Sequence, residues 1–239
     1  AVVVNPVTAD GGTQDIKPRQ RRCRKVTDDD LKTISADAHD RGDEMMRAAL
    51  FWTRVTGLRP SELPHVRVLD DNRIRIEGSK KSHNGQRGAD RDLIVHPKAY
   101  RTLKNTVDTL PSDATEVGRL QRRLQSTVNR LFPRRKAKLS LYSIRHQMGS
   151  DLKVSGKSRT EIATIMGHQA TASADQYGSR RSGRQGGFLP DAAESNAEVR
   201  ENHDQPYSQQ PHPEPDSAMD LDDDPMREPA PSKDDLGMS

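Results

Sequence analysis

Acidic residues and prolines are concentrated at the C-terminal end of this 239-residue chain, and this limits how much of it can fold. Residues 191–239 hold 14 acidic residues, three basic residues and seven prolines, with few large apolar side chains. Such a segment cannot bury enough apolar surface to offset the entropy of ordering. We therefore predict that residues 191–239 form a disordered, acidic, proline-rich tail.

The rest of the chain is strongly basic. Residues 1–190 contain 36 Lys and Arg against 21 Asp and Glu, whereas the whole chain has a net charge of only +4. A segment this basic attracts polyanions such as nucleic acids. The alternative is that the excess Lys and Arg only form a solvated surface and bind no ligand. The length of this segment suits one domain. No apolar run is long enough for a membrane span, and the single Cys23 permits no internal disulfide, so we expect a soluble, cytoplasmic protein.

Hydrophobic spacing predicts a mainly helical domain with a small sheet. Thr27 before three acids and the Ser158–Glu161 capping box both mark the starts of helices. Short alternating segments near 66–68, 74–76 and 92–95 predict three antiparallel strands. The predicted fold class is therefore α+β, mainly α with a three-stranded antiparallel sheet. Apolar periodicity and end signals predict helices over about 28–38, 43–56, 97–107, 119–131, 141–153 and 159–166.

Five polar residues stand in local contexts that favour a shared cleft. Arg59 lies in Thr-Gly-Leu-Arg-Pro, Lys80 in a basic loop between two predicted strands, and Arg145 in Ile-Arg-His. His168 follows the glycine that ends a capped helix, and Tyr177 comes nine residues later. Cleaving a phosphodiester needs a nucleophile, cations on the non-bridging oxygens and an acid for the leaving oxygen. Guanidinium groups match phosphate oxygens and stay charged, so these residue types suit that chemistry.

At these residues the chain resembles the tyrosine recombinase (phage integrase) family. The family pattern is Arg, Lys, His-x-x-Arg, His or Trp, then Tyr, in that order. The resemblance implies that Arg59 and Arg145 grip the scissile phosphate, that Lys80 protonates the leaving 5′ oxygen and that His168 hydrogen-bonds the phosphate. Tyr177 would form a 3′-phosphotyrosine, which conserves the bond energy, so that rejoining needs no ATP, metal or other cofactor.

Two positions of this predicted set stay open. Lys81 is adjacent to Lys80 and is the alternative to it. Tyr142 occupies the first His position of His-x-x-Arg, where a phenol cannot shuttle a proton readily near neutral pH but can donate a hydrogen bond to a phosphate oxygen. This replacement is consistent with slower chemistry, with a base supplied by a nearby group, or with an inactive relative. Glu62, three residues after Arg59, is expected to orient an arginine.

The resemblance covers about residues 27–180 and implies a catalytic DNA breaking-rejoining domain of the tyrosine recombinase type. Around it we expect a flexible basic arm over 1–26, a basic glycine-rich linker over 181–190 and the acidic tail. The family usually adds an N-terminal helical core-binding domain, and residues 1–26 are too short to supply one. The chain is then either a catalytic-domain fragment or a departure from the usual build.

The leading hypothesis is a site-specific DNA recombinase or integrase. The resemblance implies a homotetramer on paired double-stranded DNA sites, associated with the nucleoid and with no membrane partner. Type IB topoisomerases and telomere resolvases share similar chemistry, but the compact Gly-His-to-Tyr block favours a recombinase. The alternative from another class is a DNA-binding relative that no longer cuts, which Tyr142 permits. RNA binding is least favoured, because no stacking aromatics accompany the basic residues.

Overall fold

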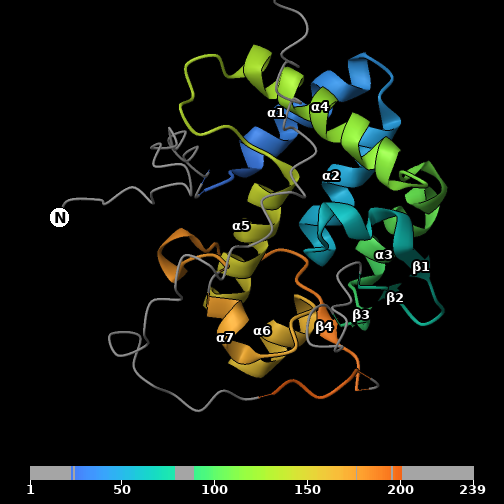
Figure 1. The fold of residues 1–239 in the computed structure, drawn as a ribbon, viewed down its shortest axis with the longest axis vertical. Helices are drawn as coiled ribbons and strands as arrows, with labels where there is room; N and C mark the ends of the chain where they lie inside the picture. Colours follow the sequence, from blue (N-terminus) through green and yellow to red (C-terminus); the bar gives the residue numbers. More distant parts are fainter. Residues whose placement is uncertain (1–22, 24, 79–88, 176, 195, 201–239) are drawn as a thin grey trace, which may run out of the picture.

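The computed structural model describes residues 23, 25–78, 89–175, 177–194 and 196–200. Within these ranges helices surround a central helix, α5, and a small sheet lies to one side (Figure 1). None of the helices described is long and apolar enough to cross a membrane. The elements in chain order are α1 (Asp28–Asp40), α2 (Glu44–Thr56), the 3-10 turn η1 (Pro60–His65), β1 (Val66–Val68), β2 (Arg73–Ile76), β3 (Arg91–Ile94), α3 (Pro97–Thr106), η2 (Val107–Thr109), α4 (Ala114–Leu131), α5 (Leu141–Val154), α6 (Arg159–Ile165), α7 (Thr171–Asp175), η3 (Arg180–Ser182) and β4 (Asp191–Ala192).

The helix ends follow local capping chemistry, as the sequence predicts. The Thr27 hydroxyl accepts a hydrogen bond from the backbone N–H of Asp30, whose carboxylate accepts one from Thr27, and α1 begins there. A second capping box, headed by Ser158, opens α6. Gly57 ends α2 in the left-handed conformation, with φ of 64°, which a residue without Cβ adopts at no steric cost. These three predicted signals are confirmed.

One predicted helix begins too late. The sequence predicts a helix from about residue 119, whereas α4 begins at Ala114. The Asp113 carboxylate caps it by accepting a hydrogen bond from the backbone N–H of Glu116. Val117 in the extra turn is buried and lies three residues before Leu120 on the same stripe, so this spacing and the aspartate cap were both available signals.

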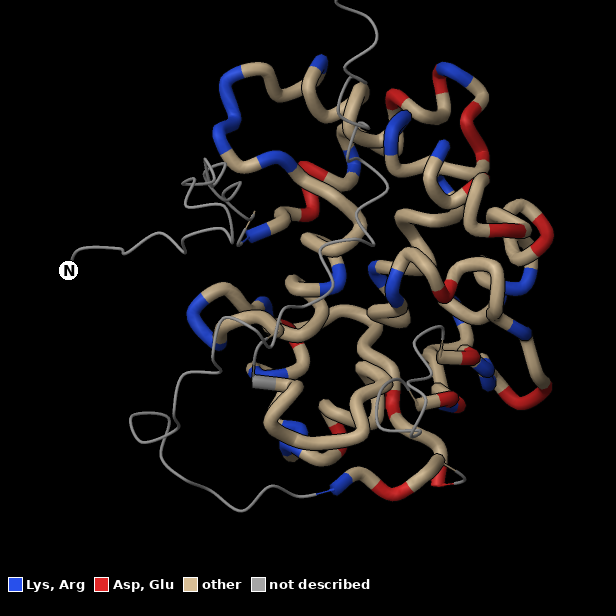
Figure 2. Tube along the Cα trace, viewed as in Figure 1, with Lys and Arg blue, Asp and Glu red and all other residues tan. Residues whose placement is uncertain are grey.

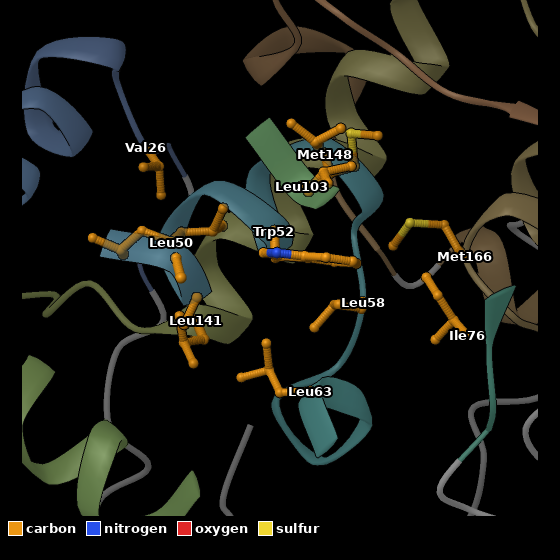
Figure 3. Close-up of a cluster of buried hydrophobic side chains, with 14 of the residues drawn as sticks. Val26, Leu50, Trp52, Leu58, Leu63, Ile76, Leu103, Leu141, Met148 and Met166 are labelled. Atoms are coloured by element: carbon orange, nitrogen blue, oxygen red, sulfur yellow. The ribbon is translucent and has the colours of Figure 1, made fainter. Parts of the chain in front are cut away.

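The hydrophobic core lies between α2, α5 and the segments that join them to the sheet. Trp52 of α2 is fully buried at its centre and is surrounded in Figure 3 by leucines and methionines from several elements. Its indole N–H donates to the Thr106 hydroxyl at 3.1 Å, so its polar atom is also satisfied. A Cβ added at Gly57 would lie 2.9 Å from the Met148 side chain and 3.2 Å from that of Met166. The end of α2 can therefore approach α5 and α6 closely.

The sheet is antiparallel, with the strand order β1-β2-β3-β4. Val66 pairs with Ile76 and Val68 with Ile74, and β2 continues the pattern onto β3 through Ile74 and Leu93. Ile74, Ile76 and Leu93 are fully buried. The mainly helical α+β class and the three predicted strands are therefore confirmed.

A fourth strand corrects the prediction of a three-stranded sheet and of a tail that begins at residue 191. Asp191 and Ala192 pair with the outer edge of β3. The Asn196 side chain then receives a hydrogen bond from the backbone N–H of Asp92 at 2.6 Å and donates one to its carbonyl at 2.8 Å. Val199 is buried. The average composition of residues 191–239 concealed the short stretch that pairs with β3 and buries Val199. Residues 201–239 lie outside those described.

The predicted arm and linker also contribute to the fold. Cys23 and Val26 are buried, and the Val26 N–H donates to the Gln147 side-chain oxygen of α5 at 3.0 Å. In the predicted linker, the Ser182 carbonyl accepts from the same glutamine at 2.7 Å, and the Arg184 N–H donates to Asp151 at 2.9 Å. Both segments therefore pack on α5, whereas the sequence predicted only a flexible arm and a linker. The remaining arm residues, 1–22 and 24, lie outside those described.

Candidate active site

A buried carboxylate paired with two arginines lies where η1 meets the sheet. Arg59 Nη1 donates to Glu62 Oε1 at 2.6 Å, and Arg91 Nη2 donates to Glu62 Oε2 at 2.9 Å. Glu62 and Arg91 are fully buried, and Arg59 is 8% exposed. The first pair is local, because Glu62 also accepts from the Arg59 backbone N–H at 2.7 Å and so caps η1. The predicted role of Glu62 in orienting an arginine is confirmed.

The charges of Glu62 and the surrounding arginines affect one another's pKa values strongly. Burial alone would raise the pKa of the Glu62 carboxyl, but Arg91, Arg59 and Arg145 together hold that pKa far below its ordinary value. Burial works against the charged form of Arg59, yet the facing carboxylate raises the pKa of that guanidinium. Glu62 is therefore ionised, and it serves as the fixed counter-charge for the surrounding arginines.

Arg145 approaches the same place from α5 and is fully buried. Its guanidinium donates to the Gly57 carbonyl and, at 2.5 Å, to the Met166 carbonyl. These carbonyls end α2 and α6, and Arg59 reaches the next one, that of Gly167, at 3.3 Å. Carbonyls at helix C-termini lack helical partners and carry partial negative charge, so they suit guanidinium groups.

Arg59, Glu62, Arg91 and Arg145 form what we call the arginine cluster. The cluster has three guanidinium groups and one carboxylate: Arg59 and Arg91 pair with Glu62, and the hydrogen bonds described for Arg145 go to carbonyls and a histidine. Burial lowers the pKa of Arg145 to about 9, and Arg59 pushes it in the same direction. A buried excess of positive charge is costly unless an anion compensates it. The cluster is therefore suited to bind an anion.

His168 lies beside this cluster and is 4% exposed. Its Nε2 is 3.1 Å from Arg145 Nη2, and its Nδ1 is buried without a hydrogen-bond partner among the residues described. Burial lowers the pKa of His168 to about 2, with Arg145 and Arg59 adding to the shift. The imidazole is therefore neutral near pH 7 in the ligand-free protein, and it acts there as a hydrogen-bonding group rather than as a cation.

Tyr177 completes the arrangement. Its ring centre is 4.8 Å from that of His168, 4.8 Å from that of His146, and 4.9 Å from the guanidinium carbon of Arg145. A cation this close to an aromatic ring is favourable. Its backbone N–H donates to the Ala174 carbonyl at 3.2 Å, just beyond α7. The phenol thus lies against the arginine cluster.

Tyr142 lies at the outer edge of the site and is 39% exposed. Desolvation raises the pKa of this phenol above its ordinary value, and Tyr177 adds to the rise, whereas Arg59 and Arg145 oppose it. These interactions show that Tyr142 is electrostatically coupled to the other site residues. With a raised pKa, it is a hydrogen-bond donor at neutral pH and not a base.

Most of the residues selected from the sequence lie close together in the structure. The structure brings together five of the predicted residues, whereas Lys80 and its alternative Lys81 lie outside the residues described. Sequence reasoning did not select Arg91 or His146. The signal for Arg91 was its position directly before the predicted strand 92–95 and two residues before Leu93, which puts both on one face of β3. The signal for His146 was only its place after Arg145. The five residues brought together are Arg59, Tyr142, Arg145, His168 and Tyr177.

No family model matches the chain, and no curated protein matches it. Among solved structures, a lambda integrase dimer bound to a COC′ core site is 19% identical over 71% of this chain and 51% of that one, with a TM-score of 0.52. Tn1549 transposon integrase in complex with a circular intermediate DNA is 15% identical over 71% of this chain and 64% of that one, with a TM-score of 0.52.

A lambda integrase tetramer bound to a Holliday junction is also similar, at 18% identity and a TM-score of 0.52, over 72% of this chain and 52% of that one. The chain has the fold of a tyrosine recombinase catalytic domain. It spans about half to two thirds of the length of these three solved chains. The expected fold resemblance is confirmed.

Proposed function

We propose that this chain is a site-specific DNA recombinase or integrase that cleaves and rejoins DNA through a 3′-phosphotyrosine intermediate, without metal or ATP. The observation that carries the proposal is the contact of one phenol with a buried excess of positive charge. The ring centre of Tyr177 lies 4.9 Å from the Arg145 guanidinium carbon, and the ring lies beside His168. In the same cluster, Arg59 and Arg91 share the single carboxylate of Glu62. A phosphodiester is an anion that would compensate this excess.

The roles follow from charge and position. Arg59 and Arg145 would bind the non-bridging oxygens of the scissile phosphate, and His168 would hydrogen-bond one of them. The hydroxyl of Tyr177 would lose its proton to solvent water as its oxygen attacks the phosphorus and forms a P–O bond, while the bond to the 5′ oxygen breaks. Lys80 or Lys81 would give the proton that this leaving oxygen needs. Rejoining is the reverse reaction, in which the 5′ hydroxyl displaces the phenol.

Tyr142 has a narrower role in this proposal. Its raised pKa makes it a hydrogen-bond donor to the phosphate, and it cannot accept the proton of Tyr177 efficiently near pH 7. The same observation favours one alternative, a DNA-binding relative of the family that does not cleave. In that case the arginine cluster would bind a backbone phosphate without any covalent step.

The surface charge supports double-stranded DNA as the partner. Figure 2 shows Lys and Arg along the connection between α4 and α5, where Arg134, Arg135, Lys136 and Lys138 lie. Opposite in this view, the turn between β1 and β2 carries Asp70 and Asp71. We further propose a homo-multimer, a tetramer on paired recombination sites, located in the cytoplasm with the nucleoid. The solved lambda integrase tetramer on a Holliday junction supports that assembly.

The deciding experiment is covalent capture on nicked DNA. A pool of duplexes, randomised around a nick that lets the short 5′-hydroxyl fragment diffuse away, is incubated with the full chain and resolved on a denaturing gel. We expect an adduct with the wild-type protein. Tyr177→Phe should abolish it and leave DNA affinity nearly unchanged, because the variant loses one nucleophilic oxygen and no cation.

Two other outcomes would change the proposal. An adduct that persists in Tyr177→Phe, mapped by peptide mass to another residue, would overturn the assignment of the nucleophile. Tight binding of the pool by the wild-type protein, with no adduct, would favour the non-cleaving alternative.

A further inference from the structure

One stripe of α5 contacts residues 177–184, which we call the nucleophile segment. Residues three or four apart on a helix lie on the same face, and His146, Gly149, Ser150 and Lys153 satisfy that spacing. A Cβ added at Gly149 would lie 3.2 Å from that of Tyr177. The Ser150 hydroxyl accepts from the Ser179 N–H at 3.0 Å, and Lys153 donates to the Gly178 carbonyl at 3.2 Å. The segment is therefore fastened along this stripe.

His146 is the member of the stripe that touches the phenol ring itself. The two ring centres are 4.8 Å apart and the planes are inclined by only 24°. Arg145, the preceding residue, also lies 4.9 Å from this ring, but its hydrogen bonds go to the Gly57 and Met166 carbonyls and to His168. Of these two consecutive residues of α5, Arg145 is therefore bonded into the anion-binding cluster, whereas His146 contacts the tyrosine through its ring.

We propose that His146 is a positioning residue whose ring holds the phenol of Tyr177 in line with the phosphate bound by Arg145 and His168. This inference rests on the proposed function of Tyr177 as the nucleophile. Among the predicted catalytic residues, Arg145 also reaches the phenol from α5, with its guanidinium carbon 4.9 Å from the ring centre, but His146 is the α5 residue whose ring lies nearly parallel to the phenol. A well-oriented nucleophile reacts far faster than one of the same chemistry that is free to rotate.

The stacked geometry favours positioning over proton transfer. The lone pairs and N–H bonds of an imidazole lie in the plane of its ring. Because the His146 ring is nearly parallel to the phenol, it presents its face and not its nitrogens to that ring. The contact resembles an offset aromatic pair, for which ring area and orientation matter more than protonation. A phenyl ring should therefore substitute for the imidazole.

The experiment compares His146→Ala with His146→Phe in the full chain, by single-turnover capture on the nicked-duplex pool. His146→Ala should form the adduct about threefold to tenfold more slowly, because an aromatic pair of this kind contributes an effect of that order. His146→Phe should restore most of the rate. His39→Ala, at an exposed histidine on α1, is the control for loss of an imidazole and should react at the wild-type rate.

Two outcomes would overturn the inference. A wild-type rate in His146→Ala would show that the ring does not position Tyr177. Equally slow reaction in His146→Ala and His146→Phe, with DNA affinity and thermal midpoint unchanged, would show that the imidazole nitrogens act and that the stack does not.

A DNA-free measurement separates this inference from the proposed function. In protein with isotope-labelled tyrosine rings, the NMR signal that disappears in Tyr177→Phe identifies Tyr177. His146→Ala should shift and broaden that signal, and His146→Phe should keep it sharp. If the wild-type protein forms no adduct but these shifts occur, the proposed cleavage fails while the positioning contact stands. An unchanged Tyr177 signal in His146→Ala rejects the contact whether or not the protein cleaves DNA.

Discussion

The arginine cluster and the nucleophile segment lie in contact but are held in place by different forces. In the cluster, charged side chains from η1, β3 and α5 meet out of water, and Glu62 and Arg91 are fully buried. In the segment, a short stretch after α7 lies along one helix through hydrogen bonds of its backbone to the Ser150 and Lys153 side chains and through ring contacts, and its last residue, Arg184, adds an ion pair with the buried Asp151. The cluster is therefore part of the core, whereas the segment is attached to it.

This difference separates stability from chemistry. A buried ion whose partner is removed keeps its desolvation cost and loses its compensation, so a change in the cluster should weaken the whole fold. A displaced segment can move into solvent, so a change there should misplace Tyr177 and leave most of the fold intact. We expect the two regions to respond oppositely in unfolding and adduct assays, and the following variants test this.

The largest effect on stability should come from Glu62→Gln. The variant leaves Arg91 fully buried with no anionic partner among the residues described, and loss of one partner of a buried ion pair costs about 3–5 kcal/mol. Asp37→Asn is the control, because it removes pairs with Arg130 and Arg41, whose side chains are 44% and 58% exposed, and such pairs contribute about 1 kcal/mol or less each. Urea unfolding measures both. Equal losses of unfolding free energy in the two variants would mean that the arginine cluster contributes no more to stability than exposed ion pairs do.

His168 connects the two regions and should make stability depend on pH. In the folded protein burial lowers the pKa of His168 to about 2, whereas in the unfolded chain it has its ordinary value near 6.5. Below pH 6.5 the unfolded chain therefore binds one more proton, and stability falls as the pH falls. The slope approaches about 1.4 kcal/mol per pH unit, so about 2 kcal/mol should be lost between pH 6.5 and pH 5.

The measurement compares urea unfolding of the wild-type protein and His168→Gln at these two pH values. The variant should lack this part of the pH dependence. Glu62 adds a loss of the same sign only at lower pH, because its pKa is depressed and its stabilisation begins to decline below the ordinary carboxyl value. Identical slopes for the two proteins between pH 6.5 and pH 5 would show that His168 is not held neutral.

The same contrast explains what sequence reasoning could find. Helix starts at Thr27 and Ser158 and the stop at Gly57 are local signals, and all three were predicted correctly. Arg59 and Glu62 are also local, three residues apart and joined through one capping interaction. Arg145, His168, Tyr142 and Tyr177 were selected through their spacing and family pattern, and the fold brings them together.

What could not be predicted depends on contacts between distant residues. Arg91 pairs with a carboxylate 29 positions away, and a strand arginine is more commonly a surface residue. His146 gains its significance only when the chain returns 31 residues later to stack Tyr177 on it. β4 was missed because its two residues precede a long acidic stretch and take their order from the open edge of β3. These three missed features are tertiary contacts, whereas the missed first turn of α4 had a local signal in its Asp113 cap.

The smallest expected change in stability, and the sharpest test of the segment, compares Gly178→Ala with Gly156→Ala. Both glycines have positive φ, 70° and 86°, so alanine should cost each about 1 kcal/mol of backbone strain. Their surroundings differ. A Cβ at Gly156 meets nothing within 4 Å, whereas one at Gly178 would lie 2.4 Å from the backbone nitrogen of Ser150 and 2.7 Å from the His146 carbonyl.

Because helix backbone cannot yield, the segment must lift from α5 in Gly178→Ala, and Tyr177 moves with it. Gly156→Ala should therefore unfold about 1 kcal/mol more easily and form the adduct at the wild-type rate. Gly178→Ala should lose a similar amount of stability, since the segment relaxes into solvent, but its adduct rate should fall about a hundredfold, the penalty for displacing a reacting group by roughly 1 Å. Urea unfolding and single-turnover capture give the two numbers for each variant. If Gly178→Ala reacts normally, the close contact with α5 does not set the position of Tyr177, and the segment would have to be ordered by bound DNA instead.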